Sequence, residues 1–335
     1  MKRREHAVRN LLTDIPGIKV GHADNLALGS GTTAIIFDEP AVASVDVRGG
    51  GPGTRDTALL DPALTVEGID AITLSGGSAF GLDAASGVQA FLRENKRGFV
   101  IGTAQVPIVP AAILFDLLNG GDKDWGRFPP YRDLGYAAAA AAGSDFALGS
   151  VGAGTGATTV SCKGGIGSAS AQTAEGHVIA ALAAVNAVGS ALVGEGPWFW
   201  AAPFEQAAEF GGRGWPAPFP QAALEPRAKG GPGENTTLVV VATDATLTKA
   251  QANRVAVMAQ SGMSRALYPV HTPLDGDVVF AASTARRPLT DPVLDLVSLG
   301  AMAANVVARA IARGVFTATA LPFAAAQPSW NDKFG

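Results

Sequence analysis

Hydrophobic and polar positions in the first half of the chain alternate between short β-branched runs, glycine-rich turns and alanine-rich stretches. Residues 32–37 (TTAIIF) and 69–74 (IDAITL) predict strands. The turn 75–78 (SGGS) predicts a helix of about 18 residues, with Ser78 as its N-cap. Apolar residues at helical spacing are expected to place this helix against the core: Phe80, Ala84, Val88, Phe91 and Leu92.

A long irregular segment separates these elements from a second block. Residues 203–234 are rich in proline, glycine and charge and keep neither the helical nor the strand period. They predict a linker or a long exposed loop. Directly after it, residues 236–243 (TTLVVVAT) predict a strand, and residues 278–284 (VVFAAST) predict another.

Capping residues mark two helices in the second block. Thr248 is the expected N-cap of a helix that Gly262 is placed to stop. The last helix has Asp291 at its cap, a proline in its first turn and Gly314 past its end.

Helices that alternate with strands, without a regular βαβ repeat, indicate sheets covered by helices. Two sheets packed between two helical layers would satisfy every apolar face. We therefore expect the α/β class and a four-layer α-β-β-α sandwich, formed as a single domain over residues 1–335. The chain has 335 residues, of which 47% are apolar, so it can bury a large core.

Charge and composition exclude several functions. A net charge of −4 gives no basic field for binding nucleic acid. The single cysteine, Cys162, excludes an internal disulfide and a cysteine-rich zinc site, and the four histidines are far apart, so no metal is expected. The first residues lack the apolar core of a signal peptide, and no uninterrupted apolar run reaches roughly 18 residues. We expect a cytoplasmic protein that does not span a membrane.

Conventional catalytic and cofactor motifs are absent as well. The chain has no G-x-S-x-G elbow, no Walker loop and no zinc-protease helix. Residues 152–157 (GAGTGA) resemble a dinucleotide fingerprint, but no acid stands at the expected distance on a following strand. No cofactor is therefore expected.

The junction between Asn235 and Thr236 is the remaining candidate for chemistry, because a polar loop runs there into an apolar strand that begins with threonine. If the Thr236 hydroxyl attacks the Asn235 carbonyl, an N-to-O acyl shift and hydrolysis release a new chain that starts at Thr236. Its α-amine, with an ordinary pKa of roughly 7.7–8.0, can act as the base for its own hydroxyl. An ordinary loop-to-strand junction would explain the same residues.

Several motifs, in the same order along almost the whole chain, resemble those of the DmpA-type N-terminal-nucleophile hydrolases. This family includes L-aminopeptidase/D-esterases, β-peptidyl aminopeptidases and nylon-oligomer (6-aminohexanoate-oligomer) endo-hydrolases. The resemblance implies the four-layer fold shared with ornithine acetyltransferase, self-cleavage into residues 1–235 and 236–335, and a homotetramer. The motifs are 17–22 (GIKVGH), 47–53 (VRGGGPG), 74–83 (LSGGSAFGLD), 107–110 (PIVP), 152–156 (GAGTG) and 163–167 (KGGIG).

The resemblance also implies roles for particular residues. Thr236 corresponds to the nucleophile, and Asn186 to the donor that stabilises the developing oxyanion. Lys163 resembles the lysine beside the nucleophile in the nylon-oligomer hydrolases, and Asp275 and Asp277 resemble their paired acids. We expect Asp275 to orient the nucleophile and Asp277 to pair with Lys163. Taken alone, these residues could equally belong to a turn, a loop cap and a solvated surface.

The predicted substrates are small amides: peptides, β-peptides or 6-aminohexanoate oligomers. Many aminopeptidase members have serine and glutamate where this chain has residues 275–277 (DGD), which favours the nylon-hydrolase branch. Phe115, expected at the substrate site, replaces a tyrosine of several relatives. Residues 101–115 contain no acid to pair with a free substrate amine, which argues against strict aminopeptidase specificity.

Three alternatives remain open at this stage. One is an aminopeptidase/D-esterase that requires a free amine, and a second is acyl transfer like that of ornithine acetyltransferase, although its Ala-Thr-Met/Leu-Leu cleavage context is absent. The third is an uncleaved, non-catalytic assembly subunit. The aromatic run 198–200 (WFW) is expected on the surface, where it would support contacts between subunits.

Overall fold

The computed structural model describes residues 9–229 and 235–335. Its longer helices are α1 (Ala84–Glu94), α2 (Tyr131–Ala140), α3 (Lys249–Ser264) and α4 (Leu294–Phe316), with the short α5 (Trp330–Phe334) near the C-terminus. Its strands are β1 (Ile18–Asn25), β2 (Ser30–Val47), β3 (Thr54–Arg55), β4 (Ile69–Ser75), β5 (Phe99–Ile101), β6 (Ala104–Val106), β7 (Ala111–Ile113), β8 (Ile166–Gln172), β9 (Val178–Asn186), β10 (Thr236–Ala245) and β11 (Val278–Arg287). The 3-10 helices are η1 (Leu12–Asp14), η2 (Ala58–Leu60), η3 (Ser78–Asp83), η4 (Gly152–Gly154), η5 (Ala202–Phe204) and η6 (Gln221–Leu224).

One long strand, β2, links the two halves of the sheet system. Its first part pairs with β1 and β4, and its second part pairs with β11. The strands follow the order β3-β7-β4-β2-β11-β10-β9-β8, with β1 beside β2, and β5 and β6 form a separate hairpin. In this sheet β10 and β11 run parallel, while β9 runs antiparallel to β10. The end of β9 therefore lies beside the starts of β10 and β11.

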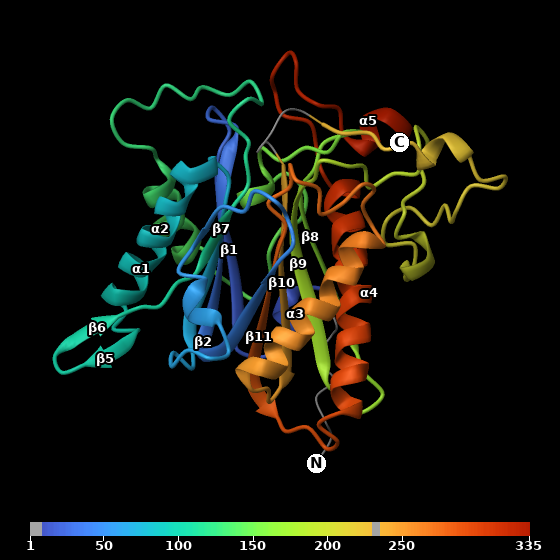
Figure 1. Ribbon diagram of the computed structural model, residues 1–335. Coiled ribbons are helices and arrows are strands. Elements are labelled where there is room, and N and C mark those ends of the chain that lie inside the picture. The colour runs from blue at the N-terminus through green and yellow to red at the C-terminus, as the bar shows by residue number, and fades with distance from the viewer. Residues whose placement is uncertain (1–8, 230–234) are drawn as a thin grey trace.

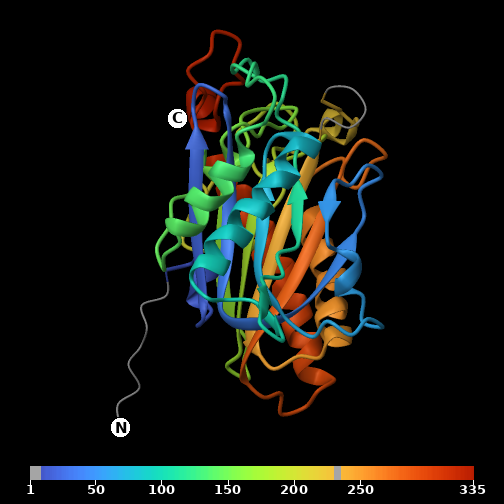
Figure 2. The ribbon, with the colours of Figure 1, turned by 90° about the vertical axis from the view of Figure 1, so that its left-hand side faces the viewer.

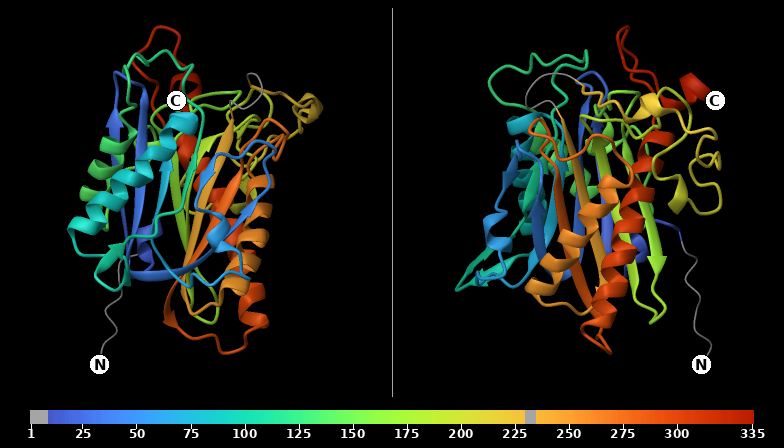
Figure 3. Two further views of the ribbon diagram at one scale, coloured as in Figure 1. Left: turned by 60° about the vertical axis from the view of Figure 1, so that its left-hand side comes forward. Right: turned by 45° about the vertical axis from the view of Figure 1, so that its right-hand side comes forward.

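Three apolar cores divide the molecule into four layers. Strand β10 shows the arrangement, because its side chains alternate between faces. Leu238 and Val240 point into the core between the two sheets, while Val239 and Val241 point toward α3 and α4. A third core lies between the other sheet and the helices α1 and α2. These helices lie on one side of the sheets in Figure 1 and face the viewer in Figure 2, and α3 and α4 cover the opposite side in Figure 3. This arrangement confirms the predicted α-β-β-α sandwich.

The predicted strands are all present, but the first predicted helix begins differently. Ser78 has a left-handed φ of 52° and its side chain caps nothing; residues 78–83 form the 3-10 helix η3, and the α-helix starts only at Ala84. Gly81 lies against the Gly76 carbonyl so closely that no Cβ fits there. Phe80, predicted in the core, is 51% exposed, because the tight first turn rotates it out of the buried stripe.

Two glycines predicted to end helices lie inside them instead. A Cβ on Gly262 would be 2.3 Å from Ala304 O, so this glycine allows α3 to approach α4. A Cβ on Gly314 would be 2.9 Å from Gly165 O, so this one lets α4 lie directly on the chain at the start of β8. The N-cap prediction for Thr248 is confirmed, because this residue forms a capping box with Gln251. The prediction for Asp291 is wrong by two residues: Pro292 and Val293 form a turn before α4, and Val293 is the N-cap. Asp291 accepts the N–H groups of Val293 and Leu294 from within that turn.

Helix α4 is long and apolar enough to cross a membrane by length and composition alone. In the fold, however, 61% of that apolar window is buried, and the helix packs against α3, β8 and β9. The apolar residues of α4 therefore pack in the hydrophobic core of the protein.

The described part of the predicted linker, residues 203–229, contains only the short helices η5 and η6. The aromatic run before it is not the exposed patch that was expected. Phe199 is buried among Phe210, Phe316 and Trp330, and Trp200 is half-buried in a second aromatic group. These aromatic partners come from the loop around Phe210 and Trp215 and from distant segments that end at Trp330, so the spacing of residues along the chain does not predict the burial.

Candidate active site

The predicted cleavage junction lies at the shared end of three adjacent strands. Thr236 begins β10 and pairs in register with Asn186, the last residue of β9. On the other side, Asn235 pairs with Asp275 in a parallel bridge just before β11. The sheet thus brings together residues that are far apart in sequence, and the predictions for Thr236, Asn186 and Asp275 converge on one place.

The Thr236 hydroxyl is placed against the peptide bond that it is predicted to cleave. Thr236 is 4% exposed, and its Oγ1 donates a hydrogen bond to the carbonyl oxygen of Asn235. The same oxygen accepts the backbone N–H of Gly276 at 2.9 Å. A backbone donor at this oxygen would stabilise negative charge that develops there during attack on the carbonyl carbon.

Both predicted acids are buried beside this junction. Asp275 Oδ1 accepts the N–H of Val188 at 3.2 Å, and its Oδ2 accepts the N–H of Thr272 at 2.9 Å. Burial, and next to it the nearby Asp277, raise the pKa of Asp275 above its ordinary value. Asp275 is therefore held in one orientation by backbone donors next to the Asn235–Thr236 peptide.

Asp277 contacts β10, the strand that begins with the predicted nucleophile Thr236. Its Oδ1 accepts the N–H of Thr237 at 2.8 Å, directly after Thr236. Its Oδ2 accepts the N–H of His271 at 3.1 Å and lies 2.9 Å from the ring Nδ1 of the same residue. His271 has a left-handed φ of 55°, a conformation that is uncommon outside glycine and that brings its ring and its N–H to one carboxylate oxygen.

The expected pair between Asp277 and Lys163 is wrong. Lys163 is 1% exposed, and its Nζ donates to the carbonyl oxygens of Gly154 at 2.9 Å and Gly164 at 2.7 Å. Burial lowers the pKa of Lys163 to about 7, opposed by the charge of Asp116. The side chain that contacts Asp277 is His271 instead, because the loop before β11 folds back on itself.

Asn186 is fixed by three neighbouring segments. Its Oδ1 accepts the N–H of Thr158 at 2.9 Å and the Nζ of Lys229 at 3.1 Å, and its Nδ2 donates to the Phe115 carbonyl at 3.0 Å. These bonds assign the orientation of the amide and place its NH₂ group on the side of Phe115. The position at the end of β9, opposite Thr236, agrees with a donor to an oxyanion at this junction.

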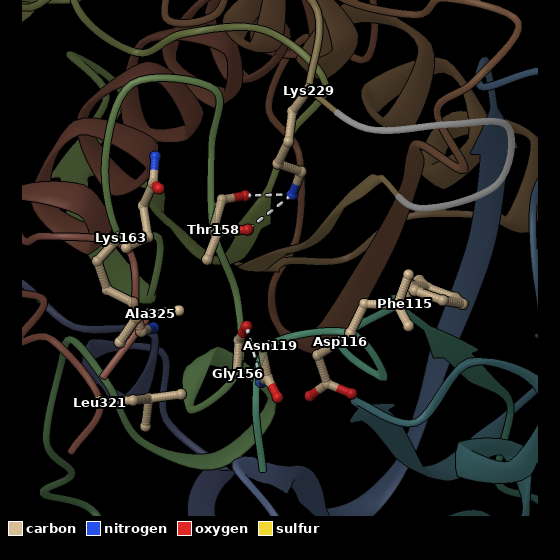
Figure 4. Close-up of a pocket in the computed structure, with 12 residues that line it drawn as sticks. Phe115, Asp116, Asn119, Gly156, Thr158, Lys163, Lys229, Leu321 and Ala325 are labelled. Carbon is tan, nitrogen blue, oxygen red and sulfur yellow. Dashed lines mark hydrogen bonds between the residues drawn. The ribbon is translucent and has the colours of Figure 1, made fainter. Parts of the chain in front are cut away.

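A cavity of about 220 Å³ (Figure 4) has Thr158 and Lys229 on its wall, the two residues that bond to the Asn186 amide oxygen. Phe115 and Lys163, both predicted site residues, are part of its wall, together with Asp116, Thr158 and Lys229. Figure 4 shows Lys229 directed at Thr158, to which its Nζ donates two bonds of 2.8 and 2.9 Å.

Sequence reasoning missed His271, Asp116 and Lys229. Asp116 directly follows residues 101–115, the segment that contains no acid, so its position one residue further along is the signal that identifies it. His271 has no other histidine near it in sequence, and its only signal is its position six residues before Asp277. No sequence pattern pointed to Lys229, because the segment that contains it was predicted to be an exposed linker. Residues 9–229 and 235–335 contain no group of three or more His, Cys, Asp or Glu side chains that could hold a metal ion.

Residues 10–327 match the family model of peptidase family S58. The chain belongs to this family. It is 41% identical to an uncharacterized aminopeptidase of Mycobacterium tuberculosis, over 97% of this chain and 98% of that protein. It is 28% identical to a 6-aminohexanoate-oligomer endohydrolase of Kocuria sp., over 88% of this chain and 82% of that protein. The mycobacterial aminopeptidase is thus the nearer of these two relatives.

Solved structures show the same fold. A Burkholderia sp. β-aminopeptidase matches with a TM-score of 0.69 at 22% identity, covering 97% of this chain and 92% of the other. The L-aminopeptidase D-Ala-esterase/amidase of Ochrobactrum anthropi, described as a variant of the Ntn hydrolase fold, matches with a TM-score of 0.65 at 20% identity, over 97% and 91%. The S58 chain therefore has the DmpA-type fold that its motifs predicted, and its family indicates a hydrolase of amide bonds.

In this S58 peptidase, we expect His271→Gly to slow the predicted cleavage between Asn235 and Thr236 by roughly tenfold or more. Asp277 loses a hydrogen bond from the ring, and bonds to charged groups contribute about 1.5–3 kcal/mol. Glycine accepts the positive φ without strain. His271→Asn tolerates the same φ and restores a nitrogen donor near Nδ1, so most of the rate should return. Rates come from the loss of full-length chain on denaturing gels. Equal rates for the wild type and His271→Gly would contradict this role.

Proposed function

We propose that the chain cleaves itself between Asn235 and Thr236, and that the freed Thr236 then hydrolyses amide bonds of small substrates. The observation that carries this proposal is the pair of donors on one carbonyl: the Thr236 hydroxyl and the Gly276 N–H both bond to the oxygen of Asn235. A nucleophile beside its target carbonyl, with a backbone donor at the oxygen, is the arrangement that acyl transfer requires.

In this proposal, self-cleavage proceeds in two steps, an N-to-O acyl shift and the hydrolysis of the resulting ester. The Thr236 oxygen forms an ester bond with the Asn235 carbonyl carbon, the C–N bond breaks, and the hydroxyl proton passes to the departing nitrogen. Water then hydrolyses the ester, leaving a carboxylate on Asn235 and a free amine on Thr236. In this proposal Asp275, buried beside the bond, orients the reacting groups.

The mature site repeats this chemistry on a substrate. The neutral α-amine of Thr236 accepts the proton of its own hydroxyl as the oxygen attacks the substrate carbonyl. Asn186 donates to the oxyanion, an interaction that typically contributes about 2.7–4 kcal/mol. Water then releases the acyl group from Thr236. We propose peptides, β-peptides and 6-aminohexanoate oligomers as candidate substrates, supported by relatives that are named aminopeptidases and 6-aminohexanoate-oligomer endohydrolases.

Intact mass and N-terminal sequencing of the purified protein test the first step. The expected products are residues 1–235 and 236–335, with the second chain starting at Thr236. Release of amine from amino-acid amides, β-dipeptides and 6-aminohexanoate oligomers tests the second. A chain that stays whole on long storage and releases no amine would favour the non-catalytic subunit, whereas acyl transfer to ornithine without hydrolysis would favour the acetyltransferase.

Lys163 gives the folded protein a pH-dependent stability that can be measured. Folding lowers its pKa from 10.5 to about 7, so the unfolded chain holds this proton more tightly between those values. The cost of burying the charge is complete below pH 7 and disappears as the pH rises toward 10.5. We expect Lys163→Met to be more favourable for stability at pH 6 than at pH 9, relative to the wild type. Urea unfolding at both pH values measures this difference, and an equal effect at the two values would refute it.

We also propose that the protein forms a homotetramer, as the resemblance implies. Because the aromatic run is not exposed, we propose the β5–β6 hairpin as the contact surface; Phe99, Val100, Ile101 and Val106 on it are each more than half exposed. Light scattering should report several αβ units at micromolar concentration. Val100→Lys combined with Ile101→Lys should lower that mass, and a lone αβ unit in the wild type would contradict the proposal.

A further inference from the structure

Charged groups of both signs line the cavity beside Asn186. Asp116 is 3% exposed and Lys163 is 1% exposed, and Lys229 lies half-buried on the wall. Cavities that bind small neutral amides need no such groups, because a buried charge is costly unless it is compensated. Their presence on one wall therefore calls for an explanation.

In residues 9–229 and 235–335 neither of the two deeply buried groups forms a direct ion pair. The two act on each other only at longer range, and the charge of the half-buried Lys123 also acts on Asp116. Asp116 accepts only the Ser30 hydroxyl and the Gly77 N–H, both at 2.7 Å. Lys163 donates to backbone carbonyl oxygens alone. Burial raises the pKa of Asp116 and lowers the pKa of Lys163, so in the empty cavity both groups are driven toward their neutral forms.

A ligand that carries one ammonium and one carboxylate would compensate both groups at once. Resting on the proposed function, we propose that the cavity binds the zwitterionic head of an amino acid, with its ammonium toward Asp116 and its carboxylate toward Lys163 and Lys229. Since both the α-amine and the α-carboxylate are then free, the amide that Thr236 cleaves must hang from the side chain. The substrate class is therefore an ω-amide of an acidic amino acid, such as a γ-glutamyl or β-aspartyl amide.

The cavity has the position and the size for this role. Thr158 and Lys229 on its wall both bond to Asn186, which lies opposite Thr236 in the sheet. A head group held there would extend its side chain toward the nucleophile. The volume of about 220 Å³ is below the roughly 300–1,000 Å³ typical of drug-sized ligands, and it suits one amino acid. Leu321 and Ala325 of the C-terminal segment form an apolar part of the wall.

Three anilides of equal chain length test the proposal on the self-cleaved enzyme. L-γ-Glutamyl-p-nitroanilide carries both charges, 4-aminobutyryl-p-nitroanilide lacks the carboxylate, and glutaryl-p-nitroanilide lacks the ammonium. We expect kcat/KM for the first to exceed that of each of the others by at least about tenfold, as one compensated charge pair predicts. Equal or better turnover of either singly charged anilide, or of L-leucyl-p-nitroanilide, would overturn the proposal while amide hydrolysis itself stands.

Binding provides a measurement that does not depend on turnover. Calorimetry on the wild-type protein should show L-glutamate binding at least about tenfold more tightly than glutarate or 4-aminobutyrate. Asp116→Asn keeps the shape of the side chain and should abolish the preference over glutarate, which lacks the ammonium, while the preference over 4-aminobutyrate remains. Asp124→Asn removes an exposed acid of the same region and should preserve both preferences. The same affinity for all three wild-type ligands would refute the zwitterion site. Tight L-glutamate binding without hydrolysis of any amide would support the site and reject the proposed function.

Discussion

Thr236→Ala should remain a single chain of 335 residues, however long it is stored, and should hydrolyse no amide substrate. The substitution removes the Thr236 Oγ1, the side-chain atom that bonds to the Asn235 carbonyl oxygen. Without that oxygen neither the ester intermediate nor the new N-terminus can form. Loss of a covalent nucleophile typically lowers kcat by roughly 10⁴-fold or more, so activity should fall below detection.

The neighbouring residue supplies a matched control. Thr237 is the next residue of β10 and fully buried, and its backbone rather than its hydroxyl contacts Asp277. Thr237→Val removes a hydroxyl from the same strand at nearly constant volume, and the chain should still split at the same bond. Thr236→Ser keeps an attacking oxygen and should split as well. Mass spectrometry of all variants decides the matter, and a Thr236→Ala chain cut at residue 235 would exclude this threonine as the agent.

Gly276→Ala should slow self-cleavage by about 100-fold or more. A Cβ at this position would lie 2.5 Å from the Thr236 Oγ1, closer than van der Waals contact permits, and 2.9 Å from the Gly51 carbonyl oxygen. Either the Thr236 hydroxyl must turn away from the Asn235 carbonyl, or Gly276 must move and withdraw its own N–H from that oxygen. A misplacement of about 1 Å at a reacting group typically costs a factor of 10².

Gly51→Ala is the control for this prediction. It lies in the adjoining loop, and its added Cβ would meet only the Asp275 carbonyl oxygen at 3.8 Å, an ordinary contact. That variant should cleave at the wild-type rate. Time courses on denaturing gels give the rates, and thermal melts of both variants identify any loss that comes from unfolding. If the folded Gly276→Ala protein cleaved itself at the wild-type rate, Gly276 would have no role in the reaction.

The pattern of residue types over a few neighbouring positions was enough to predict some strands and one helix cap. The strand at Thr236 and the N-cap at Thr248 follow from residue type and spacing over a few positions, and both are present. The four-layer arrangement was also predictable, because apolar faces on both helices and strands leave few ways to bury them all. The motifs of the family placed Thr236, Asn186 and Asp275, which the sheet then brings to one end.

Glycine shows where local reasoning fails. Gly262 and Gly314 were predicted to end their helices, since an isolated helix is weakened by glycine. Both lie within helices because the missing side chain allows a neighbouring backbone to approach, and that gain depends on a segment distant in the chain. The aromatic run 198–200 failed as a surface prediction for the same reason, because its partners come from residues up to 330.

The sequence by itself therefore determined four of the strands, the helix cap at Thr248, the layered fold and the identity of the nucleophile candidate. Only the tertiary structure decided the contacts of the charged groups: His271 rather than Lys163 at Asp277, and a cavity that brings Lys163 together with Asp116 and Lys229. The physical reason is that secondary structure depends on neighbours a few residues away, whereas the pairing and pKa of a charged group depend on distance and burial in space. Those distances are fixed when strands and loops from opposite ends of the sequence meet.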